Sequence, residues 1–384
     1  MTEFKKISCE NCGGELIFSP GTQLSACNFC GSEFNILNSS DTQVKTVEKI
    51  LPFNTTTNEF EIAALKWLSE GDLTPDDILD SSLFNNQVGV YLPMWMYEGR
   101  YDGSWSASSG YTRIEEYVGR SLDGKKLETK TRTVTDWRPS NGNCKGDFQF
   151  LATASSESSI PTNVKVFSHH VNVTRNNLKD FKTEYTQGFS LLEIQLDSDN
   201  CWDLFGRVQA DHYVERESKK RIPGDTYKDF YVDAVYDLNK KTSCYVPFWL
   251  RNYKYSNVDF HLYMDGTNTS RIDGKRPVDK ERKGVLKAID QSRNIGCFIF
   301  IVIAFIPLIA QVDPDFSGGF FWVVAIIGII YAVVKEKEKT KIINESKQIR
   351  KNKLEARISA LTNGSSEMID STRVAENNSN TPSF

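Results

Sequence analysis

Two long apolar runs dominate the pattern of hydrophobic and polar positions along this chain. Residues 295–312 and residues 317–334 contain no charged side chain, and each run is about eighteen residues long. A helix of about 17–25 apolar residues is long enough to cross the hydrocarbon core of a bilayer. Because a short polar loop joins the two runs, the pattern predicts a transmembrane helical hairpin over residues 294–335, with membrane lipid around it. A buried α-hairpin in a soluble core is the alternative.

Basic residues flank the predicted hairpin on its outer sides. Seven Lys or Arg residues lie in residues 275–293 and eight lie in residues 335–353, whereas the loop between the runs carries only Asp313 and Asp315. Positively charged flanks are retained on the cytoplasmic side of a membrane. The sequence therefore predicts a multi-pass protein of the cell (inner) membrane with both termini in the cytoplasm.

The segment after the hairpin is predicted to be a cytoplasmic helix over residues 336–361. Its apolar residues form an imperfect stripe of five side chains, which are Ile342, Ile349, Leu354, Ile358 and Leu361. Because fewer than four clean heptads are present, the pattern favours a solvated helix. A short coiled coil that joins copies of the chain into an oligomer is the alternative. Residues 362–384 are polar and predict a flexible tail.

Residues 47–274 show the mixed helix and strand signals of an α+β body that is rich in strands. Thr56 and Glu59 fit a capping box at the start of one predicted helix, and Gly71 fits its end. A short helix is predicted from Thr74, which precedes a proline. Residues 198–221 predict a further helix, and segments of strand-like composition follow both helical regions.

The phrase Tyr-x-Pro-x-Trp occurs twice in this body. It reads YLPMWMYEGRY at residues 91–101 and YVPFWLRNYKY at residues 245–255. Because each copy follows a predicted helix, the order predicts two related halves, residues 47–150 and 160–274, packed through their Trp-bearing strands. Trp95 and Trp249 are then expected to be buried core anchors, and a ligand-binding aromatic pair is the alternative.

Four of the eight cysteines lie within the first thirty residues and form a spaced motif. Cys9 and Cys12 are followed, after fourteen residues, by Cys27 and Cys30. This C-x2-C-x14-C-x2-C spacing is typical of a tetrahedral Zn²⁺ site with four thiolate ligands, and a redox dithiol pair is the alternative. A module as small as residues 1–38 cannot bury a sufficient core by itself. The predicted zinc ribbon therefore uses its metal as a structural staple.

The charge of this N-terminal segment favours a protein contact over nucleic acid. Residues 1–37 contain two lysines and four glutamates, which gives a net charge of two minus four, or −2. Binding to phosphate depends on cationic side chains that neutralise it. The whole chain, with a net charge of −4, likewise gives no general reason to expect a polyanionic partner.

Several phrases carry a resemblance to a known family. After the paired cysteines come ALKWL, LTPDDI and GVYLPMW, and later YVPFWLRNYKY, FHLYMDGTN and GKRP. In this order they resemble a widespread bacterial family of zinc-ribbon membrane proteins, often labelled as related to primosomal protein N-prime (replication factor Y), a superfamily II helicase. The resemblance covers about residues 5–340. It implies a zinc ribbon and hydrophobic C-terminal segments, and it implies no settled activity.

The sequence contains no recognisable catalytic motif. Gly124 and Gly274 precede lysine, but neither belongs to a G-x-x-x-x-G-K-[ST] phosphate loop, so NTP hydrolysis is not expected. The four histidines lie in no spaced metal motif, and the pair His169 and His170 is interpreted as two faces of a strand. We therefore do not expect an enzyme.

Together these features predict an α+β multidomain protein. It has an N-terminal zinc ribbon, a duplicated β-rich soluble body and a C-terminal transmembrane helical hairpin. We interpret it as a non-enzymatic scaffold or adaptor that recruits a protein partner at the cytoplasmic face of the membrane. The alternatives are a membrane-tethered nucleic-acid-binding protein and an enzyme that uses a cleft between the two halves.

Overall fold

The chain has a mixed α+β architecture with a large sheet and two apolar C-terminal helices, as the sequence predicts. The computed structural model describes residues 4–11, 15–18, 24–27, 32–35, 40–42, 47–81, 83–84, 88–120, 127–155, 164, 167–169, 171–174, 176–309 and 314–378. These residues group into two compact units that interleave along the sequence. The first unit comprises residues 1–56, 86–251 and 263–271, and the second comprises residues 57–85, 252–262 and 272–384.

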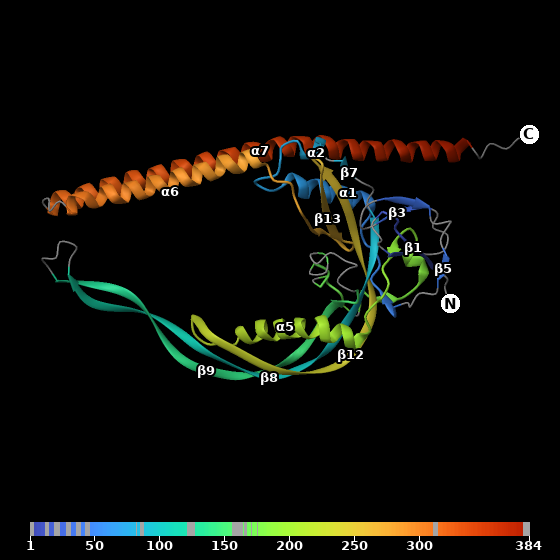
Figure 1. Cartoon of the computed structure of the whole chain (residues 1–384), viewed down its shortest axis with the longest axis horizontal. Coiled ribbons are helices and arrows are strands. Elements are labelled where there is room, and N and C mark those ends of the chain that lie inside the picture. The colour runs from blue at the N-terminus through green and yellow to red at the C-terminus, as the bar shows by residue number, and fades with distance from the viewer. Residues whose placement is uncertain are drawn as a thin grey trace, which may run out of the picture. The chain divides into compact units, whose positions relative to one another are not determined.

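Three long strands form the centre of the first unit. They are β8 (Val88–Arg120), β9 (Leu127–Thr153) and β12 (Thr226–Tyr255), and they make the long, curved antiparallel ribbon of Figure 1. β9 stays paired with β8 as far as the Arg120–Leu127 pair, whereas the pairing of β12 with β8 ends at Gly110–Thr226. The sequence predicts strand-like segments within β8 and β12, but it predicts neither β9 nor strands of this length.

A helical segment covers one face of the ribbon. It consists of α4 (Ser198–Cys201), a π-helical turn η3 (Trp202–Gly206) and α5 (Arg207–Lys219), which confirms the helix predicted over residues 198–221. The Asp197 carboxylate accepts hydrogen bonds from the backbone N–H groups of Asp199 and Asn200, and this caps the segment. Trp202 of this segment packs with Tyr97, Tyr101, Trp105 and Phe148 of the strands in one aromatic cluster.

The two Tyr-x-Pro-x-Trp phrases are neighbours in the sheet. Tyr91 pairs with Pro247 and Pro93 pairs with Tyr245, so the phrases run antiparallel around the Leu92–Val246 pair.

The Trp249 side chain is buried against Phe53 and Phe189, and its indole N–H donates to Thr55 Oγ1 at 2.8 Å. The Trp95 side chain is half-buried, and its N–H donates to the Leu196 carbonyl at 2.9 Å. Trp249 is therefore buried as the sequence predicts, whereas the prediction of a buried Trp95 is wrong, since this side chain only packs against the edge of the core. The helices that precede the two phrases lie in different units, and the two-half architecture stays a prediction.

Short strands complete the sheet. They are β1 (Phe4–Ser8), β2 (Glu15–Phe18), β5 (Ser40–Thr42), β6 (Lys49–Ile50), β10 (Lys179–Asp180) and β11 (Ser190–Leu191), in the order β10-β6-β12-β8-β11-β2-β1-β5. β11 lies after the 3-10 turn η2 (Thr183–Thr186) and pairs with β2 through Ser190–Phe18. β3 (Leu24–Ala26) and β4 (Glu33–Asn35) pair with each other. The described N-terminal strands β1, β2 and β5 therefore belong to the same sheet as the body.

The second unit contains the helices around the two apolar runs. Its elements are α1 (Thr57–Ser69), α2 (Ile78–Ser81), β7 (Leu83–Phe84), the ends of β12, β13 (Val258–Asp265) and β14 (Asn268–Gly274), α6 (Lys280–Ile309) and α7 (Pro314–Asn378). Gly71 adopts a φ of 91° just after α1, a conformation that favours glycine, which confirms the predicted helix end. The Arg276 guanidinium lies over the Trp67 ring, 3.8 Å from its centroid.

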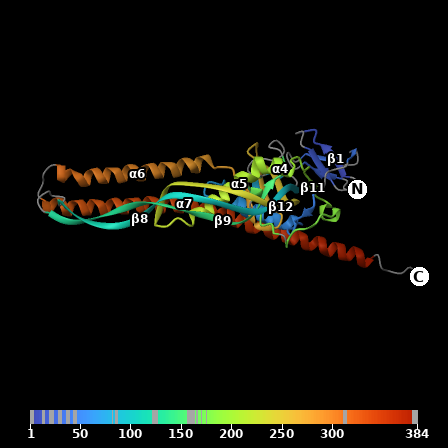
Figure 2. The same cartoon turned by 90° about the horizontal axis from the view of Figure 1, so that it is seen from below.

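α6 and α7 lie side by side as a hairpin, as Figure 2 shows. Each contains an 18-residue window long and apolar enough to cross a membrane, and each window is 11% buried within the protein. Glycine at position 296 lets the two helices approach closely, because a Cβ atom there would collide with the Tyr331 ring. The Tyr331 hydroxyl lies 2.9 Å from Ser292 Oγ. Residues 310–313, between the two helices, lie outside the described residues.

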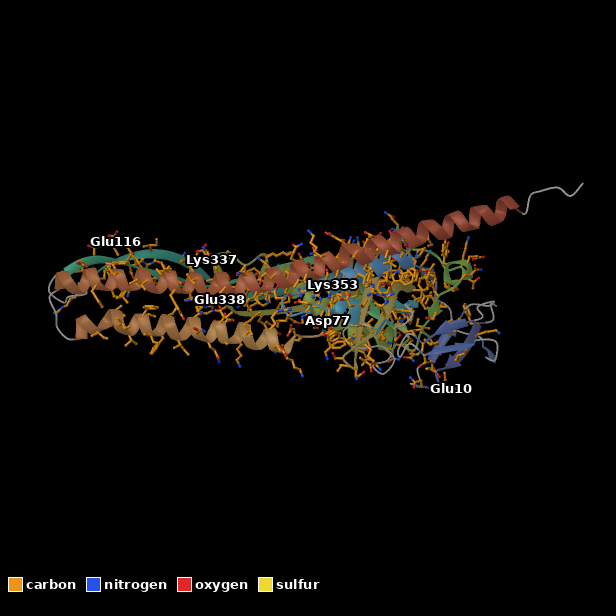
Figure 3. All side chains as sticks on the ribbon, turned by 90° about the horizontal axis from the view of Figure 1, so that it is seen from above. Glu10, Asp77, Glu116, Lys337, Glu338 and Lys353 are labelled. Carbon is orange, nitrogen blue, oxygen red and sulfur yellow. The ribbon has the colours of Figure 1, made fainter. Side chains whose placement is uncertain are left out.

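α7 continues without interruption from the second apolar run into the predicted cytoplasmic helix. Residues 336–361 pack against α1 and α2 of the same chain, where Lys347 pairs with Asp72 at 2.7 Å and Arg350 pairs with Asp76 at 3.1 Å. In Figure 3, the labelled residues Lys337, Glu338 and Lys353 lie along this helix. Residues 362–378, predicted as part of a flexible tail, also continue the helix.

Candidate functional site

The structure places two of the four predicted zinc ligands at equivalent points of two β-hairpins. Cys9 follows β1, whose last residue Ser8 pairs with Glu15. Cys27 follows β3, whose last residue Ala26 pairs with Glu33. Both cysteines are buried in one hydrophobic cluster, and the Cys27 N–H donates to the Ser32 carbonyl at 2.8 Å.

The other two predicted ligands, Cys12 and Cys30, lie outside the described residues. Within the described part of the chain, no group of three or more His, Cys, Asp or Glu side chains could hold a metal ion. Cys9 and Cys27 nevertheless fit the predicted donor set, because each starts the connection of a hairpin that also contains the second cysteine of its pair. Two such turns are how paired thiolates reach one zinc ion.

Three further cysteines are packed thiols, as the sequence predicts. Cys144, Cys201 and Cys244 are fully buried in the first unit. The Cys201 thiol donates to the Thr153 carbonyl at 3.2 Å. Burial raises the pKa of Cys201 to about 11 and the pKa of Cys244 to about 12. At neutral pH these two thiols are therefore protonated and poor nucleophiles.

A cavity of about 710 Å³ lies beside the covering helix of the ribbon. Residues 149–151 of β9 form one side, and side chains of η3, α5, His169 and residues 171–173 form the other. Its apolar lining includes Leu151, Val171 and Phe205. Leu204 and Val208, one helical turn apart, also line it, although they are 59% and 51% exposed. The exposed side chains of His212 and Arg216 contribute polar atoms. This combination suits the binding of an apolar group that approaches from solvent.

His169 lies in the wall of this cavity and not on a strand. Phe167 and Ser168 are helical and His169 lies in a turn, so the predicted strand over this segment is wrong, and His170 lies outside the described residues. The Thr153 N–H donates to His169 Nε2 at 3.4 Å, and the Gln209 side-chain amide contacts Nδ1. Both ring nitrogens thus have partners within the chain, which fixes the orientation of the imidazole. Tertiary packing against β9 overrides the local alternation here.

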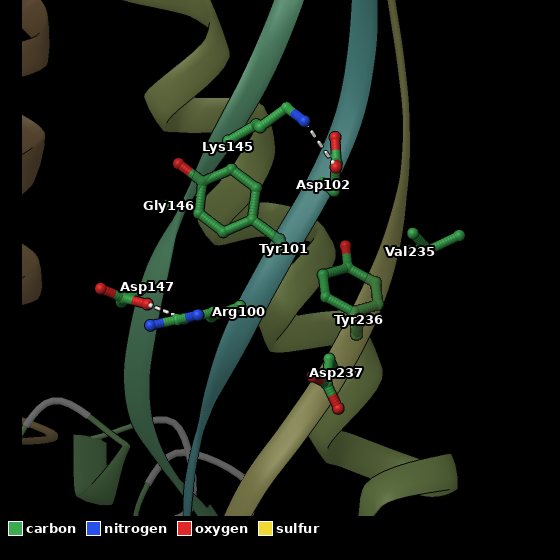
Figure 4. Close-up of a pocket in the computed structure, with 9 residues that line it drawn as sticks. All are labelled: Arg100, Tyr101, Asp102, Lys145, Gly146, Asp147, Val235, Tyr236 and Asp237. Atoms are coloured by element: carbon green, nitrogen blue, oxygen red, sulfur yellow. Dashed lines mark hydrogen bonds and ion pairs between the residues drawn. The ribbon is translucent and has the colours of Figure 1, made fainter.

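A second hollow, of about 440 Å³, lies on the ribbon (Figure 4). The Arg100 guanidinium lies 3.1 Å from the Asp147 carboxylate, and the Lys145 ammonium lies 2.8 Å from the Asp102 carboxylate. Each of these ion pairs joins residues that are directly opposite in the β8–β9 register. Such pairs stabilise the register of a sheet by a few tenths of a kcal/mol to ~1 kcal/mol. The hollow is therefore a ladder of cross-strand pairs, and it does not converge on a ligand.

Sequence reasoning missed the cavity beside the helix. Its lining comes from residues spread between 149 and 216, and no short motif connects them. The signal that was available is the pair Leu204 and Val208, which places two aliphatic side chains on one face of a predicted helix otherwise rich in charge.

Comparison with known proteins gives a distant relative. The chain is similar to the uncharacterized protein YdjG of Bacillus subtilis (strain 168), with 24% identity over an alignment of 327 residues, and the match covers 71% of this chain and 90% of YdjG. No family model matches the chain, and no solved structure matches it. The similarity extends over most of both chains and carries no activity with it.

Proposed function

We propose that this protein is a membrane-anchored, zinc-binding scaffold that recruits a protein partner at the cytoplasmic face. The observation that supports the membrane anchor is the exposed apolar surface of α6 and α7. Only 11% of the apolar window of each helix is buried within the protein. A core helix of a soluble protein is mostly buried, whereas lipid-facing side chains have no protein neighbours. Exposed side chains such as Phe298, Trp322 and Ile330 would contact lipid.

The polar groups at the base of the hairpin support the same proposal. Arg293 forms ion pairs with Asp290 and Glu336, and Lys339 Nζ lies 2.9 Å from the Asp290 carboxylate. These residues flank the apolar runs on one side, together with the basic segments before α6 and along α7. By the positive-inside rule, this end would lie in the cytoplasm. Both termini, and the first unit, would then lie in the cytoplasm.

The zinc ion would be held by Cys9, Cys12, Cys27 and Cys30. The support is the spacing in the sequence and the placement of Cys9 and Cys27 at the two hairpin connections. A four-thiolate Zn²⁺ site is closed and structural. Here it would stabilise the end of the sheet formed by β1, β2 and β5.

The partner would bind at the cavity beside α5. An exposed leucine and an exposed valine at its edge, above an apolar interior, match the arrangement of an interface hot spot that accepts an apolar side chain. Leu204 and Val208 would contact this side chain directly. The surrounding Gln149, Gln209 and His212 side chains would form a polar rim.

A charged residue at this position is expected to abolish partner binding without unfolding the protein. Val208→Glu places a carboxylate at the edge of an apolar cavity, where desolvation opposes docking. Because Val208 is half exposed, the substitution should change the free energy of unfolding by less than about 1 kcal/mol. Proteins that co-purify with the detergent-solubilised full chain are identified and quantified by mass spectrometry. A specific partner should fall roughly tenfold or more with this variant.

The matched control is Val235→Glu, which makes the same change at a valine that is 72% exposed on the ribbon, outside this cavity. The partner should be retained by this variant. Equal recovery with the unsubstituted chain and with Val208→Glu would contradict the proposed site.

A further inference from the structure

The end of the ribbon is a two-stranded hairpin that projects beyond β12. We call residues 111–120 of β8 and residues 127–136 of β9 the distal ribbon. Its two strands pair with each other in register, and the β12 pairing with β8 ends at the Gly110–Thr226 pair. An isolated two-stranded ribbon is marginally stable in water, and a further layer on one of its faces would stabilise it.

The two faces of the distal ribbon differ in chemistry. On one face, charged groups neutralise one another within the chain. Arg113 lies 2.8 Å from Asp136, Arg132 lies 2.8 Å from Glu115, and the Arg132 guanidinium lies over the Tyr117 ring. This face is already satisfied and offers a partner little further energy.

The opposite face, which we call the open face, is rich in β-branched side chains. Its positions alternate with those of the charged face, and they are Thr112, Ile114, Glu116, Val118, Arg120, Leu127, Thr129, Thr131, Thr133 and Thr135. Ile114 is 75% exposed, Val118 is 68% exposed and Leu127 is 73% exposed. β-Branched and aliphatic residues on one face of a sheet are typical of a surface that packs against another layer.

The charges on the open face suit a second copy of the same face. Glu116 and Arg120 are four residues apart on one strand, or about 13 Å between their Cα atoms at the usual rise per residue. Across the strands Glu116 lies opposite Thr131 and Arg120 lies opposite Leu127, so neither charge has an opposite charge directly across the ribbon. A two-fold axis through Val118 would place Glu116 of each copy opposite Arg120 of the other. One acidic and one basic group at symmetric positions make this face self-complementary, whereas a strongly charged partner would find no net charge to bind.

We propose that two copies of this chain associate through the open faces of their distal ribbons. The contact is isologous and face to face, with Val118 at its centre, Ile114 and the threonines around it, and two Glu116–Arg120 ion pairs across the axis. This association is independent of the zinc site and of the partner cavity. It also leaves the face of residues 336–361 that packs on α1 and α2 in place.

Charge reversal tests this contact directly. Glu116→Arg gives each copy two positive charges at the contact, and Arg120→Glu gives each copy two negative charges. Each variant alone is expected to self-associate roughly tenfold or more weakly than the unsubstituted chain, because like charges then face each other. An equimolar mixture of the two variants restores both ion pairs and should form the mixed dimer. The mass of the detergent-solubilised full chain is measured by light scattering, and differently tagged variants report mixed dimers by co-purification.

The control is Glu128→Arg, which makes the same change of charge on the charged face of the same ribbon. It should associate as the unsubstituted chain does. The proposal is overturned by a monomeric unsubstituted chain, by single reversals that associate normally, or by a mixture that fails to pair. Loss of association with Glu128→Arg equal to that with Glu116→Arg would also overturn it.

Discussion

Replacing Cys27 with serine is expected to release one zinc ion per chain and to unfold the N-terminal hairpins. Structural zinc contributes about 10–16 kcal/mol of apparent binding free energy in zinc-finger peptides at pH 7. A tetrahedral site that loses one of four thiolates loses most of this energy. The damage should extend into the main sheet, because β2 pairs with β11 through Phe18 and Ser190. Elemental analysis of the purified protein measures the zinc content, and thermal unfolding measures the loss of stability.

The control is Cys297→Ser on α6, outside the proposed metal site, which should keep the zinc. A second variant, with serine at all four positions Cys9, Cys12, Cys27 and Cys30, should contain no zinc. A metal content equal to that of the unsubstituted chain in this variant would contradict the zinc assignment.

Removing the Arg350 side chain is expected to detach α7 from α1 and α2. Arg350 is fully buried, and its guanidinium donates hydrogen bonds to three backbone carbonyls, those of Ser69 at 2.8 Å, Gly71 at 2.7 Å and Thr74 at 2.6 Å. The Thr74 carbonyl keeps a second donor, Arg282, at 2.7 Å, so two acceptors lose their partner. Each such acceptor costs about 1–3 kcal/mol, so Arg350→Ala should destabilise the second unit by about 2–6 kcal/mol. Hydrogen exchange read by mass spectrometry should show faster exchange in α1 and in residues 336–361.

The comparison for this variant is Lys351→Ala, the next residue along the same helix. Lys351 is exposed and lies 3.9 Å from Glu355, so its removal should change the free energy of unfolding by about 0.5 kcal/mol or less. Similar exchange in the two variants would show that the Arg350 contacts do not hold α7 in place.

The sequence predicts the local elements of this fold well where strong local signals exist. The α1 helix follows from its capping residues and from Gly71, which adopts the positive φ expected at a helix end. The helix over residues 198–221 follows from its composition and is found with a π-helical turn at Trp202–Gly206. Two apolar helices follow from the absence of charge in residues 295–312 and 317–334.

The length of the ribbon is not predictable in this way. Residues 127–136 mostly alternate charged residues with threonine, and residues 111–120 mix charged, aromatic and aliphatic positions. Neither strand therefore shows the apolar alternation that marks a half-buried strand. Their pairing depends on contacts between two segments and on the β8–β12 register farther along. The continuous α7 helix has a similar cause, because Lys347 and Arg350 contact acidic residues more than 270 positions earlier in the chain.

The candidate sites also differ in whether their signal is local in the sequence. The cysteine pairs carry their signal in fixed spacing, so residues 9, 12, 27 and 30 are recognised at once. The cavity beside α5 carries no such spacing, since Leu151, Val171 and Val208 meet only after β9 and the helix pack together. The open face of the distal ribbon becomes visible only when the register assigns Glu116 and Val118 to one side.

The membrane anchor is the central claim, and labelling of single introduced cysteines in intact cells tests it most directly. A membrane-impermeant thiol reagent is applied to chains with cysteine at Ser317, Thr2 or Ser383, and labelling is compared with that of the unsubstituted chain. The proposed topology predicts new labelling at position 317, between the two apolar runs, and none at positions 2 and 383. Labelling at both termini but not at position 317 would reverse the orientation. An unsubstituted chain found entirely in the soluble fraction of those cells would contradict the anchor itself.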